Sequence, residues 1–133
     1  MVKEISVRTK SHSEMVSITG QVESALRDMG LKDGLAAVYV PHTTAGLTIQ
    51  ENADPAVRAD ILYVMDKIVP WKDPNYRHME DNTAAHVKAS LMGFSKMLLV
   101  EHGRIMLGTW QTLYFCEFDG PRNRKVIIKA ISA

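Results

Sequence analysis

The chain has 133 residues, of which 46% are hydrophobic and 23% charged, and its formal net charge at pH 7 is +1. These values are ordinary for one globular domain without disulfide staples, so we expect a single domain over residues 1–133. The near-neutral charge argues against a nucleic-acid partner, and no apolar stretch approaches the length of a membrane span.

The compartment is predicted from two features of the sequence. The N-terminal residues contain no hydrophobic leader. The single cysteine, Cys116, lies in an apolar run and has no intrachain partner for a disulfide, which fits a reducing environment. We therefore expect a cytoplasmic protein in which Cys116 is a small core residue.

Hydrophobic periodicity and turn residues predict the elements in chain order. The first half has a strand over 3–10, a segment at 15–18 that starts either a strand or the next helix, a helix from 18 to a stop at Gly30, and strands over 35–41 and up to Glu51. Two helices follow: the first begins at Asp54-Pro55 and ends at Pro70, and the second is capped by Asp81 or Asn82 and ends at Gly93. The last predicted elements are strands over 96–100, 109–118 and 124–131. This order predicts an α+β fold with a mostly antiparallel, β-sandwich-like core of two sheets and about three helices.

The most polar strand ends lie between residues 42 and 54. One predicted strand leads into His42, Thr43 and Thr44, and the next leads into Glu51 and Asn52. Polar groups at this density cost stability unless partners or a ligand satisfy them. The segment is therefore interpreted as one wall of a site.

The predicted helix after Asn82 carries a narrow polar stripe. At helical spacing, His86 is flanked by Asn82 and Thr83 on one side and by Ser90 on the other. The stripe is either a solvated helix face or the wall of a cleft, in which case His86 and Ser90 take part in chemistry.

Three histidines come from a strand end, a loop and a helix, namely His42, His78 and His86. Such a set predicts a metal site with an open coordination position, as in catalytic Zn²⁺ centres, although each histidine is also explained by a structural role. Glu51 and Asp81 are then candidate bases that activate a metal-bound water.

The segment 103–111 is a third candidate. Gly103 and Gly108 allow backbone to approach a ligand closely, Arg104 suits an anionic group such as phosphate, and Gln111 lies just inside the next strand. A hairpin punctuated by glycines explains the same pattern without a ligand.

Together these segments resemble one family. The motifs are HTTAGLTIQENAD at 42–54, His78 followed by DNTAAHVKAS at 81–90, and GRIMLGTWQ at 103–111. They are similar to the signatures of the YjbQ-like proteins, formerly an uncharacterised family and often labelled secondary thiamine-phosphate synthases. The resemblance covers essentially the whole chain.

The resemblance implies a homotrimer with a metal near the shared histidines. It also implies the joining of hydroxymethylpyrimidine diphosphate to thiazole phosphate, as a side activity in many members. The implied substrate-binding residues are polar or glycine, namely Thr43, Thr44, Asn52, Asn82, Arg104, Gly108 and Gln111. Imidazole ligands favour Zn²⁺, whereas diphosphate chemistry favours Mg²⁺. The alternatives are a non-catalytic trimer that binds a metal or a phosphorylated metabolite, and a metal-dependent hydrolase.

Overall fold

The computed structural model describes residues 2–133, which form eight strands and three helices. In chain order they are β1 (Val2–Arg8), β2 (Glu14–Ser17), α1 (Thr19–Asp28), β3 (Gly34–Tyr39), β4 (Ala45–Glu51), α2 (Pro55–Ile68), α3 (Thr83–Met92), β5 (Ser95–Glu101), β6 (Arg104–Ile105), β7 (Gln111–Glu117) and β8 (Asn123–Ser132).

The strands pair into two sheets. The larger sheet has the order β1-β8-β3-β5-β6 and the smaller one the order β2-β7-β4, and each pairing is antiparallel. The predicted α+β fold with a two-sheet core is confirmed. The segment at 15–18 forms β2, and the short strand β6 lies between the predicted strands over 96–100 and 109–118.

Strand β7 lies between two hydrophobic layers, which explains its nearly continuous apolar sequence. Leu113 and Phe115 point into the core shared with the larger sheet and α1. Tyr114 and Cys116 point the other way, into a second cluster covered by α2 and α3. Burial raises the pKa of the Cys116 thiol to about 12, so this cysteine is an unreactive core residue, as expected.

The ends of the helices follow local rules. Asp54 caps α2 by accepting a hydrogen bond from the Ala56 backbone N–H at 2.9 Å, with Pro55 in the first turn. Gly30 and Gly93 adopt positive φ just after α1 and α3. Asn82 occupies the N-cap position of α3, but its side chain does not cap the helix, which corrects the predicted cap.

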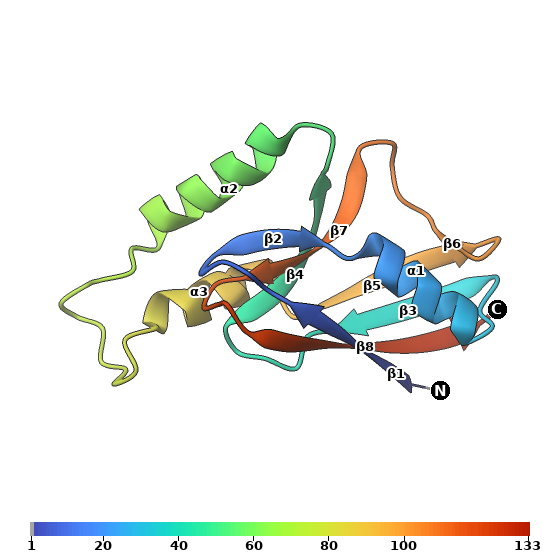
Figure 1. Ribbon diagram of the computed structural model, residues 1–133, viewed down its shortest axis with the longest axis horizontal. Coiled ribbons are helices and arrows are strands. Elements are labelled where there is room, and N and C mark those ends of the chain that lie inside the picture. The colour runs from blue at the N-terminus through green and yellow to red at the C-terminus, as the bar shows by residue number, and fades with distance from the viewer. Residues whose placement is uncertain (1) are drawn as a thin grey trace.

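The helices α2 and α3 lie over the smaller sheet, and the loop between them extends at one end of the molecule (Figure 1). The buried Lys88 of α3 pairs with Asp66 and ties the two helices together. Strand β6 and helix α1 lie toward the opposite end. Within residues 2–133, no helix is long and apolar enough to cross a membrane.

A close backbone contact sets the position of α3 over β4. A Cβ atom on Gly46 would lie 2.6 Å from the carbonyl oxygen of Gly93, too close for any side chain. Gly46→Ala should therefore lower the free energy of unfolding by about 1–3 kcal/mol, as measured by urea denaturation. Gly20→Ala in α1, where no atom lies within 4 Å of the added Cβ, is the matched control and should not destabilise the protein. Equal stability of Gly46→Ala and wild type would contradict this packing.

Candidate functional site

A polar cavity opens beside the N-terminal end of α3, where β4 begins and β7 ends. Its volume is about 300 Å³. Its lining combines two arginines, two histidines and smaller polar groups, namely Pro41, His42, Thr43, Thr44, Glu80, Asn82, His86, Arg122 and Arg124. We call it the arginine cavity.

A buried ion pair forms the floor of this region. Glu117 at the end of β7 is 0% exposed and Arg124 of β8 is 4% exposed. The Nε atom of Arg124 donates to Glu117 Oε1 at 2.8 Å, and Nη2 donates to Oε2 of Glu117 and to Thr44 Oγ1. Thr9 donates to the same carboxylate at 2.7 Å. Burial alone would raise the pKa of Glu117, but these hydrogen bonds outweigh it and hold the pKa below its usual value.

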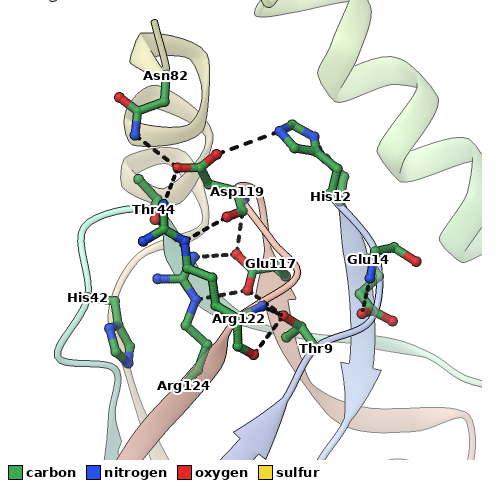
Figure 2. A network of polar contacts seen from close by, with 12 residues as sticks. Thr9, His12, Glu14, His42, Thr44, Asn82, Glu117, Asp119, Arg122 and Arg124 are labelled. Carbon is green, nitrogen blue, oxygen red and sulfur yellow. Dashed lines mark hydrogen bonds and ion pairs between the residues drawn. The ribbon is translucent and has the colours of Figure 1, made fainter. Parts of the chain in front are cut away.

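Asp119 connects the arginine cavity to its surroundings (Figure 2). Its Oδ2 atom accepts hydrogen bonds from Asn82 Nδ2 at 2.9 Å and from Arg122 Nη2 at 2.8 Å. Its Oδ1 atom lies 3.7 Å from His12 Nε2. Asp119 therefore fixes Arg122 on one wall and the start of α3 on another.

His42 is held by the backbone of β8. Its Nε2 atom accepts a hydrogen bond from the Lys125 N–H at 2.9 Å. Burial lowers the pKa of His42, and the positive charge of Arg124 lowers it further, so the ring is neutral at pH 7. A neutral imidazole that accepts at Nε2 carries its proton on Nδ1, which makes His42 a hydrogen-bond donor.

A second cavity adjoins His78. It measures about 310 Å³, and two aromatic side chains contribute to its lining of Trp71, Lys72, Asp73, Tyr76, His78, Asp81 and Thr83. We call it the aromatic cavity. The rings of His78 and His86 meet edge to face between the two cavities, with centroids 5.2 Å apart. The site therefore combines a polar part that contains two arginines with a part that contains two aromatic side chains.

The three predicted metal ligands are only partly brought together. His78 and His86 are in contact, and His42 shares the arginine cavity with His86, but the lone pair of His42 Nε2 is already bound to Lys125. Within residues 2–133, no three His, Cys, Asp or Glu side chains are grouped as a metal site. One chain alone therefore does not fit a three-ligand Zn²⁺ centre, and the ligand roles stay predictions.

The other predicted residues divide between two ends of β4. Thr43, Thr44, Asp81 and Asn82 lie at the two cavities. Ser90 donates to the His86 carbonyl within its own helix.

The second group lies where β4 ends. Glu51, at the end of β4, pairs with Gln111 of β7. Glu51 follows Ala45, the first residue of β4, by six positions, so the two ends of the strand lie about 20 Å apart. Asn52 accepts a hydrogen bond from Tyr114, and Gln111 accepts one from the Gly108 N–H. Arg104 lies on β6, farther from the cavities. A single chain therefore keeps this group apart from the histidines.

Sequence reasoning missed the charged residues that define the arginine cavity. Arg122 and Arg124 belong to a short basic run between two predicted strands, and Glu117 lies in an apolar run. The available signal was Glu117 itself, because a carboxylate inside a buried strand requires a cationic partner.

The fold and the site define a small two-sheet α+β protein with a polar, arginine-containing cavity at the start of its third helix. Residues 3–133 match the family model described as UPF0047 protein YjbQ-like, and the chain belongs to this family.

Relatives of similar length support this membership. The UPF0047 protein YugU of Bacillus subtilis is 52% identical over 97% of this chain and 98% of its own length. The UPF0047 protein MJ1081 of Methanocaldococcus jannaschii is 45% identical over 98% and 94%. A crystal structure of an uncharacterised YjbQ/UPF0047 family protein from Clostridium acetobutylicum has a TM-score of 0.93 at 50% identity, covering 97% of this chain and 99% of that one.

The buried ion pair makes a testable contribution to stability. Glu117→Gln leaves the buried Arg124 without its counter-charge and should lower the free energy of unfolding at pH 7 by about 3–5 kcal/mol. The pKa of Glu117 is lowered in the fold, so its contribution is present above the unfolded-state pKa and is lost as pH falls through the folded-state pKa. Denaturant unfolding at neutral and acidic pH should show the difference from wild type shrinking in acid.

The exposed pair between Lys125 and Glu4 provides the control. Glu4→Gln should change stability little at either pH. A Glu117→Gln protein as stable as Glu4→Gln at pH 7 would show that the buried pair does not support the fold.

Proposed function

We propose that this protein is an enzyme that binds a phosphorylated small molecule in the arginine cavity and has thiamine-phosphate-synthase-like activity. The observation that carries the proposal is that the arginine cavity adjoins the aromatic cavity at the His78–His86 pair. Arg122 and the N–H of neutral His42 suit phosphate oxygens. Trp71 and Tyr76 in the adjoining cavity suit a flat ring.

The reaction sets clear demands on such a site. The bond between the pyrimidine methylene carbon and the diphosphate oxygen breaks, and its electron pair leaves with pyrophosphate. The thiazole nitrogen then supplies the electron pair for the new carbon–nitrogen bond. Arg122 and His42 would stabilise the charge that develops on the leaving group, and the aromatic cavity would hold the pyrimidine ring.

A divalent metal is a separate part of the proposal. Imidazole suits Zn²⁺ and diphosphate oxygens suit Mg²⁺, and the His78–His86 pair is the place where imidazole ligands are closest. Because this pair is not a complete ligand set in one chain, the proposed roles of Arg122 and His42 do not depend on it.

The proposed assembly is a homotrimer. The outer face of the larger sheet carries exposed apolar side chains that neighbour one another in register, since Leu35 faces both Leu99 and Ile131, and Ala37 faces Met97. Such a face on a globular protein favours a protein interface. Each interface of a cyclic trimer joins two different surfaces, so this assembly can bring the Gln111 end of one copy toward the cavities of the next.

The enzymatic proposal predicts that purified protein makes thiamine phosphate from the two precursors. His42→Ala and His86→Ala should each lower kcat/KM by about 100-fold or more, because each removes a group that lines the cavity. His102→Asn, at a positive φ in a distant exposed turn, is the control and should keep wild-type activity. Metal analysis of the same preparations tests whether bound Zn²⁺ falls in His86→Ala.

Three outcomes separate the alternatives. The same trace yield from wild type and His86→Ala would indicate a contaminating synthase. Tight diphosphate binding without product would favour a binding protein. Phosphate release that a chelator abolishes would favour a hydrolase.

The assembly proposal predicts light-scattering masses three times that of the chain. Leu99→Asp on the sheet face should produce monomers, because a carboxylate cannot be buried there without a partner. Tyr63→Asp, at an exposed apolar position of α2, is the matched control and should leave the trimer intact. A monomeric wild type, or loss of the trimer in Tyr63→Asp alone, would contradict the assigned face.

A further inference from the structure

The side-chain polar atoms that are buried without a partner lie together. Among residues 2–133 there are two such atoms, Asn82 Oδ1 and Thr83 Oγ1, and both belong to the first residues at the start of α3. Asn82 is only 6% exposed and lines the arginine cavity. A buried carbonyl oxygen without a donor is costly, so its position beside a cavity indicates a missing partner.

The orientation of the Asn82 amide is fixed by its neighbour. Its Nδ2 atom donates to Asp119 Oδ2 at 2.9 Å, and the reversed amide would place two oxygens against each other. In Figure 2 the amide nitrogen points toward Asp119 and the oxygen points away from it. Asn82 therefore presents an acceptor, not a donor, on its other side.

The Asn82 side chain does not play the capping role that is usual for an asparagine at the N-cap of a helix. An asparagine at an N-cap normally accepts a hydrogen bond from the first turn of the helix, which stabilises the helix. Here the side chain makes no cap hydrogen bond. The charged donors nearby do not bind Asn82 Oδ1, because Nε and Nη2 of Arg122 donate to Asp119 and Arg124 donates to Glu117 and Thr44.

We propose that Asn82 Oδ1 accepts a hydrogen bond from a hydroxyl or amino group of the phosphorylated ligand. This inference rests on the proposed function and narrows its substrate class to phosphate esters or diphosphates that carry such a donor close to the phosphate. Arg122 and His42 bind the anionic group, and Asn82 selects the donor. An analogue without the donor leaves the buried carbonyl unpaired and is rejected.

Calorimetric titration of the wild-type protein with two isosteric probes tests this selection. The probes are 2-hydroxyethyl phosphate and propyl phosphate, which differ by a hydroxyl in place of a methyl group, and inorganic phosphate is the reference. We expect the affinity for 2-hydroxyethyl phosphate to be higher than that for propyl phosphate by a factor of about ten or more. Equal affinity for the two esters would overturn the inference while leaving the phosphate site intact. Failure of all three to bind would overturn the proposed function as well.

The variant Asn82→Leu assigns the preference to Asn82. Asn82→Leu removes the acceptor and should bind both esters equally.

A preference that persists in Asn82→Leu would contradict the assignment. A second contradicting result concerns metal ions. If the wild-type protein binds Zn²⁺ or Mg²⁺ in the absence of phosphate and Asn82→Leu does not, Asn82 Oδ1 is a metal ligand and not a selector of the ligand's donor group. If Asn82→Leu does not fold, the comparison of the two esters on the wild-type protein decides.

Discussion

The ion pair between Glu117 and Arg124 is the constraint on which the site depends. Glu117 ends a strand of the smaller sheet, and Arg124 lies in a strand of the larger one. Thr9, just after β1, and Thr44, just before β4, bind the same pair. Four chain segments from two sheets therefore meet at one buried charge network. A buried pair of this kind is costly to break, so the two sheets are held in a fixed relation where the cavities open.

The same network explains how two arginines lie beside one cavity in a chain of net charge +1. Glu117 neutralises Arg124, and its buried charge allows that guanidinium to stay beside the cavity without solvent. The pKa of His42 is lowered by burial and by Arg124, so the histidine contributes an N–H dipole instead of a second full charge. Asp119 similarly orients Arg122 and Asn82. Preorganised donors of this kind bind phosphate oxygens with little rearrangement.

The fold could be predicted because its signals are local. Period-two alternation or continuous apolar runs mark the strands, and Asp54-Pro55 is a strong local signal for a helix start. The site could be predicted only in part. Residues at both ends of β4 look equally polar in the sequence, and strand length separates them by about 20 Å. Arg124 could not be assigned because its role depends on facing Glu117 across the two sheets, which no local periodicity encodes.

The central claim is that phosphate binds in the arginine cavity, between β8 and the start of α3. The most direct measurement is an anomalous-scattering map of crystals soaked in tungstate, an oxyanion that mimics phosphate. We expect the strongest peak within hydrogen-bond distance of Arg122 and His42. A strongest peak beside Arg104 on β6, with no density in the arginine cavity, would contradict this account.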